Sequence, residues 1–108
     1  MDIHESRSGS VLVLAPSGKL DGFSAPTLEA QVNRFLAEGE KRIVFDCSGL
    51  QFISSAGLRL FLATAKHLQA AGGRCGFASL SPEAREIFRL SSFLALLEIH
   101  DTVADACA

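Results

Sequence analysis

The sequence predicts an α/β domain with a mixed β-sheet, because short apolar runs of β-forming residues alternate with segments of helical periodicity. Strands joined through a helix pair in parallel, whereas the first two predicted strands share a short turn and should pair antiparallel. The length fits one domain over residues 1–108, and the 48% of hydrophobic residues is enough for a single core.

Two strands are expected before the first helix. Residues 2–7 are predicted to form an edge strand, since Ile3 is their only strongly apolar residue. Residues 11–15 form a compact apolar run typical of a buried strand. Pro16 and Gly18 are expected to end this second strand, because both interrupt strand structure.

A helix and a buried strand are expected next. Ser24 is the candidate N-cap of the helix, and Gly39 is its expected end. The apolar residues that share one face of this helix are Leu28, Val32, Phe35 and Leu36. Residues 43–47 follow as a strand covered on both faces. No element is assigned to residues 50–53.

The second half of the chain repeats the alternation. Its longest helix is predicted over residues 58–71, and a strand follows at 77–80. Ser81 should cap a helix that has proline at its first position and an acidic first turn. Residues 96–99 are expected to form the last strand, with a helix as the alternative, and Asp101 is the candidate cap of a short final helix.

Composition and charge exclude several classes of function. The formal net charge of −2 argues against a nucleic-acid module, and no apolar run is long enough to span a membrane. The polar N-terminus does not resemble a signal peptide. Three distant cysteines can form neither a disulfide framework nor a CxxC zinc motif. A cytoplasmic protein without a metal is therefore expected.

The chain also lacks the usual signatures of catalysis. His4, His67 and His100 stand in no motif with a serine or cysteine nucleophile, and neither phosphate-binding glycine motif occurs. Asp46 follows a buried strand, where a phosphorylated aspartate could lie, but the second acidic cluster that this chemistry needs is missing. Asp46 is expected to cap the next turn instead. No catalytic residue and no cofactor are predicted.

Two hydroxyl groups, those of Ser54 and Ser55, precede the longest helix. Serine is a preferred N-cap, so capping alone explains one of them. The helix that follows begins with apolar residues that cannot share one stripe, namely Leu58, Leu60, Phe61 and Leu62. Either this turn is fully buried, or an apolar side chain is exposed for a partner.

A phosphate on a serine at this position would alter binding without unfolding the domain. The free N–H groups and the dipole of a helix N-terminus favour an anion. The same group adds a charge of about −1.5 to −2, which would oppose docking of an apolar partner surface. A phosphoserine in this segment would thus spare the fold while changing what binds to it, which supports a switch.

Three motifs together make the chain similar to a STAS domain of the anti-sigma factor antagonist type, from Val11 to about Ala106. The matching segments are Gly18-Lys19-Leu20-Asp21, Asp46-Cys47-Ser48-Gly49-Leu50 with Phe52-Ile53, and Ser55 with Gly57-Leu58. Ser81-Pro82 before the third helix also fits. The resemblance implies a STAS fold, with a central mixed sheet of four to five strands flanked by about four helices on one side.

The resemblance also implies partners and a switch. Such a protein binds an anti-sigma factor that is itself a GHKL-type serine kinase, which phosphorylates the antagonist and releases it, and a PP2C-type phosphatase restores it. Ser55 would be the phospho-acceptor, and Ser54, where many members have aspartate, is the second candidate. The expected partner-binding residues are Asp21, Gly22, Ser54, Ser55, Gly57, Leu58 and Phe61.

Other functions remain open at this level. A STAS regulatory subunit of a transporter complex is one alternative, although such subunits often lack the acceptor serine. A partner switch that controls secretion or another non-transcriptional output is another. No residue cluster supports an enzyme or a nucleotide-binding module. The chain is expected to be a monomer or a weak homodimer.

Overall fold

A mixed sheet of six strands lies at the centre of the molecule. The computed structural model describes residues 1–90 and 97–108, and four helices accompany the sheet in this part of the chain. The strands are β1 (Asp2–Ser8), β2 (Val11–Leu20), β3 (Arg42–Asp46), β4 (Leu50–Ile53), β5 (Arg74–Ala78) and β6 (Glu98–His100). The helices are α1 (Ala25–Ala37), α2 (Ser55–Ala70), α3 (Pro82–Leu90) and α4 (Val103–Cys107). The predicted α/β class is confirmed.

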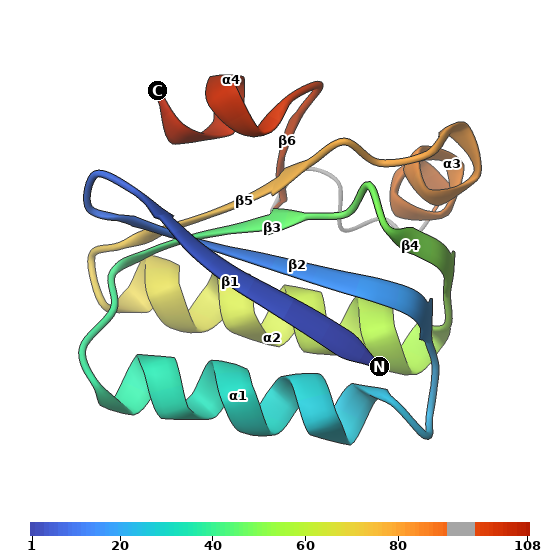
Figure 1. The fold of residues 1–108 in the computed structure, drawn as a ribbon, viewed down its shortest axis with the longest axis horizontal. Coiled ribbons are helices and arrows are strands. Elements are labelled where there is room, and N and C mark those ends of the chain that lie inside the picture. Colours follow the sequence, from blue (N-terminus) through green and yellow to red (C-terminus); the bar gives the residue numbers. More distant parts are fainter. Residues whose placement is uncertain (91–96) are drawn as a thin grey trace.

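The strands follow the order β1-β2-β3-β5-β6, and β4 lies beside the second half of β2. β1 and β2 pair antiparallel through their short turn, as predicted, whereas the other pairs are parallel. α1 and α2 lie side by side under one face of the sheet, and α4 lies over the other face (Figure 1). Both α1 and α2 begin at the end of the sheet where β2 and β4 finish.

The larger core fills the space between the sheet and the helices α1, α2 and α3. The ring of Phe61 on α2 contacts Phe45 of β3 and Phe77 of β5, at centroid distances of 4.8 and 4.9 Å. Phe88 of α3 joins them, 5.7 Å from Phe77. Such aromatic clusters contribute more than their buried area alone, so they fix the position of α2 on the sheet.

A smaller core lies on the opposite face, so the expectation that all helices flank one side is wrong for α4. Alternate residues of a strand point to opposite faces. Val11 and Val13 of β2 therefore meet Ala106 of α4, together with Val44 and Ala78. The cap of α4 also differs from the prediction, because Thr102 Oγ1, and not Asp101, accepts from the backbone N–H of Asp105 at 3.0 Å.

The strand β2 continues through Pro16 and Gly18, where the sequence predicts its end. Residues Leu12–Leu14 pair with β3, and the segment from Gly18 to Leu20 pairs with β4. Pro16 lies between these two paired segments, where the parallel neighbour of β2 changes from β3 to β4. Gly18 has a φ of 96° and adjoins an irregularity in the register, a conformation that glycine tolerates.

The remaining predicted elements are present with shifted ends, and β5 covers Arg74–Ala78 where the sequence predicts a strand at 77–80. α2 begins at Ser55, three residues earlier than predicted, and Ser81 Oγ accepts from the backbone N–H of Ala84 at 3.1 Å at the start of α3. β4 forms at residues 50–53, for which the sequence predicts no element, and it raises the number of strands above the expected four to five. Part of the predicted last strand, Leu96, lies outside the described residues, and Glu98–His100 form β6.

Candidate functional site

Two loops meet where the neighbouring parallel strands β2 and β4 end. Leu20 is in register with Ile53, and the backbone N–H of Ser54 donates to the carbonyl oxygen of Leu20 at 2.8 Å. The Asp21 loop (residues 21–24) and the start of α2 therefore lie next to each other, at the right-hand end of Figure 1. The structure thus brings together Asp21, Gly22 and both candidate serines, as the sequence analysis expected of one partner surface.

The side chain of Asp21 organises its own loop. Its Oδ1 accepts hydrogen bonds from the backbone N–H groups of Phe23, at 2.9 Å, and Ser24, at 3.0 Å. These bonds, first that from Ser24 and then that from Phe23, favour the charged carboxylate and hold the pKa of Asp21 below its usual value. The loop is therefore fixed in shape with an anionic group at its start.

Ser24 precedes α1 as predicted, but its side chain makes no cap hydrogen bond. Its Oγ donates to the carbonyl oxygen of Lys19 at 2.6 Å and accepts from the backbone N–H of Asp21 at 2.9 Å. The serine hydroxyl therefore closes the loop, and a proline in the first turn of α1 reduces the need for a cap because it has no N–H to satisfy.

The two serines before α2 have different roles. Ser54 is the N-cap, and its Oγ accepts from the backbone N–H of Gly57 at 3.4 Å. Ser55 is the first helical residue, and its side chain is exposed. Among the described residues, the Ser55 hydroxyl has no hydrogen-bond partner. Capping thus accounts for Ser54 and leaves the hydroxyl of Ser55 free.

Gly57 is packed directly against β2. A Cβ atom at this position would lie 2.6 Å from Cγ of Leu20 and 3.2 Å from its carbonyl oxygen. No real Cβ makes so close a contact with a buried side chain, so glycine allows the first turn of α2 to approach the sheet. Gly57 therefore positions the site and is itself buried.

The apolar start of α2 is fully buried, which decides between the two alternatives that the sequence left open. Leu58 and Leu60 are buried, and Phe61 has no exposed surface. The structure thus removes Phe61 from the expected partner surface, because its ring belongs to the aromatic core. Leu58 is likewise a packing residue in this conformation.

Two exposed aromatic residues that are not among the expected partner-binding residues lie at the site instead. The side chain of Phe23, in the Asp21 loop, is 96% exposed, and that of Phe52, on β4, is 50% exposed. Phe52 is in register with Lys19, close to the same end of β2. A phenylalanine inside the turn sequence Asp-Gly-Phe-Ser was the available signal for Phe23, because turns usually carry polar residues.

A groove of about 350 Å³ runs between the first turns of α1 and α2, beside the Asp21 loop. Its lining consists mostly of small or apolar side chains, and its charged residues are Glu29 of α1 and Arg59 of α2. No ion pair within 4.0 Å joins these two residues. The groove extends the candidate surface from the loop toward both helices.

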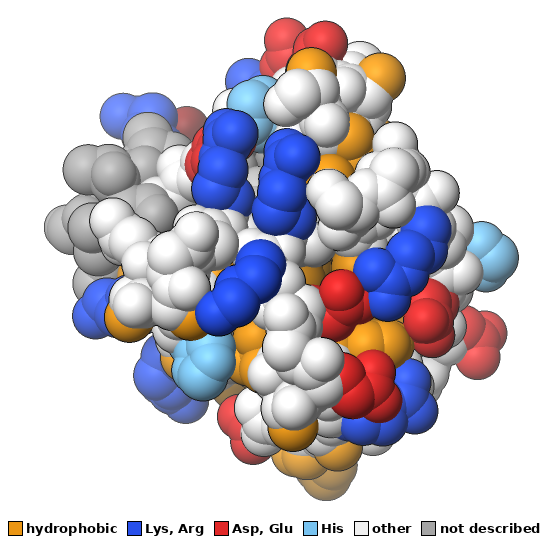
Figure 2. Space-filling model, turned by 90° about the vertical axis from the view of Figure 1, so that its left-hand side faces the viewer, with side chains coloured by type: hydrophobic (Ala, Val, Ile, Leu, Met, Phe, Trp, Pro, Cys, Tyr) orange, Lys and Arg blue, Asp and Glu red, His pale blue; other side chains and the backbone are white. Residues whose placement is uncertain are grey.

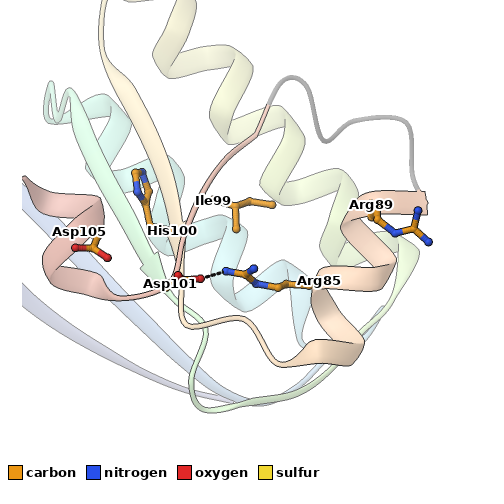
Figure 3. A pocket seen from close by; sticks show the side chains of 6 residues that line it. All are labelled: Arg85, Arg89, Ile99, His100, Asp101 and Asp105. Atoms are coloured by element: carbon orange, nitrogen blue, oxygen red, sulfur yellow. Dashed lines mark hydrogen bonds and ion pairs between the residues drawn. The ribbon is translucent and has the colours of Figure 1, made fainter.

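A second hollow, of about 570 Å³, lies between α3, β6 and α4, and its described lining residues form no nucleophile–base pair. Figure 3 shows the Arg85 guanidinium reaching from α3 to Asp101, with which it forms an ion pair. Arg89 pairs with Glu86 on its own helix. Both cations are thus already neutralised, and none of the described lining residues is a serine or a cysteine.

The opposite end of the sheet carries basic side chains. Figure 2 shows Lys and Arg gathered on this face. Arg42 and Arg74 are in register at the starts of β3 and β5, next to Lys41. Arg74 pairs with Glu98, and the Lys41 Nζ donates to the carbonyl oxygen of Ala71. The cluster is small, and part of its positive charge is balanced by Glu98, so it does not indicate a nucleic-acid surface.

The two buried cysteines and Asp46 have structural roles. Burial raises the pKa of the Cys47 thiol to about 12 and also raises that of Cys75, so neither is a thiolate at neutral pH. Asp46 accepts from the backbone N–H of Ser48 at 3.1 Å and thereby caps its turn, as predicted. Among the described residues, no cluster of three metal-ligating side chains occurs, and no helix has the length and hydropathy of a membrane span.

Known proteins resemble this chain over nearly its whole length. The model of the STAS domain family matches residues 3–106. BtrV of Bordetella bronchiseptica, provisionally named an anti-sigma factor antagonist, is 32% identical over 108 residues, which cover 100% of this chain and 93% of BtrV.

Solved structures show the same fold. An anti-sigma factor antagonist from Mycobacterium paratuberculosis superposes with a TM-score of 0.89 at 26% identity, covering 98% of this chain and 90% of that one. The Bacillus anti-sigma factor antagonist SpoIIAA, in its unphosphorylated form, gives 0.82 at 22% identity, covering 98% and 93%.

Proposed function

The chain belongs to the STAS domain family, and from this premise we propose that it is an anti-sigma factor antagonist switched by phosphorylation of Ser55. In its unphosphorylated form it binds and sequesters an anti-sigma factor, so that the sigma factor is free to act. It performs no catalysis of its own, and its place of action is the cytoplasm.

The observation that carries this proposal is the exposed, unbonded hydroxyl of Ser55 beside the Asp21 loop. A kinase must reach the acceptor oxygen, and this oxygen is engaged in no structural hydrogen bond among the described residues. Ser54 is a weaker candidate, because its Oγ caps α2 and is only partly exposed.

The surroundings of Ser55 explain how a phosphate would release the partner. A group with a charge of about −1.5 to −2 at the first position of α2 is tolerated by the helix dipole, so the fold persists. The exposed ring of Phe23 is an apolar contact that a partner would bury. A phosphate close to such an interface would have to be desolvated, which opposes docking.

The partners follow from this role. The anti-sigma factor is also a serine kinase with a GHKL-type ATP site, and a PP2C-type phosphatase removes the phosphate. The partner-binding surface comprises Asp21, Gly22, Phe23 and the start of α2, with the α1–α2 groove as its extension.

A phosphorylation assay tests the proposal. Incubation with a purified GHKL-type anti-sigma factor kinase and ATP should add one phosphate, measured by intact mass, and Ser55→Ala should abolish the addition. Ser54→Ala is the matched control and should still be modified. Phosphorylation of the Ser55→Ala variant would show that the acceptor is elsewhere.

A binding assay tests the switch itself. Ser55→Asp should fold with the thermal stability of the parent chain and bind the kinase weakly, because the added charge lies at the interface. A Ser55→Asp variant that unfolds would assign the residue a structural role. Stable co-purification with a transporter, without kinase binding, would instead favour a regulatory STAS subunit.

A further inference from the structure

Arg59 lies one helical turn after Ser55 on α2, and both side chains are exposed. Residues four positions apart on a helix are neighbours, with their Cβ atoms about 5–6 Å apart. Long side chains on a helix lean toward its N-terminus, so the guanidinium of Arg59 can reach the turn that carries Ser55.

Arg59 also has no counter-ion among the described residues. Five of the seven arginines of the chain form ion pairs with carboxylates, namely Arg7, Arg34, Arg74, Arg85 and Arg89. In the described part of the chain, Arg59 and Arg42 form none. Glu29 lines the same groove as Arg59 but stays beyond 4.0 Å from it. The unpaired guanidinium of Arg59 thus lies one helical turn from the unbonded hydroxyl of Ser55.

We propose that Arg59 is a positioning residue that pairs with a phosphate on Ser55 and holds it against the start of α2. The inference rests on the proposed function, because it takes Ser55 as the acceptor. The planar fork of arginine binds two phosphate oxygens at once, which lysine cannot do. The pair stabilises the phosphorylated form without rearranging the helix.

The pair has a consequence for the partner surface. In the unphosphorylated chain, Glu29 and Arg59 give the α1–α2 groove one charge of each sign. A phosphate on Ser55 draws the Arg59 guanidinium out of the groove and leaves Glu29 as its charged residue. Phosphorylation therefore changes the surface at two places, the start of α2 and the groove.

The test installs phosphoserine at position 55 during translation, so that it needs no kinase. The ³¹P NMR signal of the phosphate is titrated between about pH 4 and 8, around its ordinary second pKa near 6. Because a nearby cation favours the dianion, Arg59→Gln should raise the titration midpoint by about 0.5 pH unit. Arg59→Lys should recover part of this shift.

Arg42→Gln is the matched control, since Arg42 is the other unpaired arginine and lies at the start of β3, at the opposite end of the sheet. It should leave the midpoint unchanged. An Arg59→Gln midpoint equal to that of the parent would overturn the inference. Failure of any kinase to modify Ser55 would overturn the proposed function instead, and the ³¹P titration would still report on Arg59.

Discussion

Gly57 and Leu20 are in such close contact that a single added methyl group has no room between them. A Cβ atom on Gly57 would lie 2.6 Å from Cγ of Leu20 and 2.8 Å from its Cδ2. Leu20 is fully buried and ends β2, directly before the Asp21 loop. The contact therefore sets the spacing between that loop and the serines at the start of α2.

Gly57→Ala is expected to destabilise the protein by about 1–2 kcal/mol. Overpacking a core costs about 1–3 kcal/mol, here about 2–3 because the contact is as short as 2.6 Å, and the better helix propensity of alanine returns about 1 kcal/mol. Urea denaturation measures the difference. Gly22→Ala is the control, because no atom lies within 4 Å of the added Cβ, and its stability should stay within about 0.5 kcal/mol of the parent. Equal stabilities for both variants would contradict the packing argument.

Alanine substitutions of the two serines should have different effects on the free energy of unfolding. Ser54→Ala removes the cap of α2 and should lower the free energy of unfolding by about 0.5–1 kcal/mol, toward the lower end because the bond is long at 3.4 Å. Ser55→Ala removes an exposed, unbonded hydroxyl and should be neutral. Denaturant midpoints measure both. A destabilised Ser55→Ala would mean that its hydroxyl has a structural partner.

Phe23→Ala should weaken binding of the anti-sigma factor without changing stability. The ring is 96% exposed, so the folded chain loses almost no buried area when it is removed. An aromatic hot spot at the centre of an interface contributes about 2 kcal/mol or more, which is about a thirtyfold change in Kd. Calorimetric titration against the purified kinase measures the change.

Leu90→Ala is the matched control for Phe23. Leu90 is a large apolar residue, 68% exposed, at the end of α3 and outside the proposed surface. Replacement of Leu90 by alanine should leave the Kd for the kinase within about twofold of the parent value. Equal losses for both variants would show that the partner does not distinguish the Asp21 loop from the rest of the apolar surface.

Much of the fold could be predicted because its core elements carry strong local patterns. The continuous apolar run of β3 and the helical periodicity of α1 both have the burial that the sequence indicates. Ser81 before Pro82 marks a helix start, and its cap hydrogen bond is present. In each case the local signal and the tertiary environment agree.

The departures arise where tertiary pairing overrides local preference. β2 continues through Pro16 because its parallel pairing partner changes from β3 to β4 at that point. This change of partner can be recognised only in the assembled sheet. β4 escapes prediction because it has four residues and no alternation, with Leu50 and Ile53 buried and the two between them exposed. α4 covers the second face because Val11 and Val13 need burial there.

The candidate site was only partly predictable for a similar reason. The resemblance to STAS domains implied one surface for Asp21 and Ser55, and the parallel pairing of β2 and β4 brings the two residues together. Apolar character alone could not tell Phe61, which is buried, from Phe23, which is exposed. The burial of Phe61 depends on which face of α2 meets the sheet, which Gly57 and the aromatic core fix, whereas Phe23 is exposed because its loop lies at the end of β2.

Asp21 should make the stability of the protein depend on pH in the acidic range. Its carboxylate accepts two backbone hydrogen bonds in the folded state, which lowers its pKa below the ordinary value of 3.8. A lowered folded-state pKa means that the unfolded chain binds the proton more readily, so stability is gained as pH rises. The contribution of Asp21 is complete above about pH 5 and is lost as pH falls through 3.8 and below.

Comparison with Asp21→Asn isolates this contribution, because the amide keeps the shape of the carboxylate and cannot ionise. The parent should be more stable than the variant at pH 7, and the difference should shrink steadily between about pH 5 and 2 as the carboxylate becomes protonated. Urea denaturation across this range gives the difference, and carbon-detected NMR gives the pKa of Asp21 directly. A difference that stays constant with pH would show that the charge of Asp21 does not stabilise the loop.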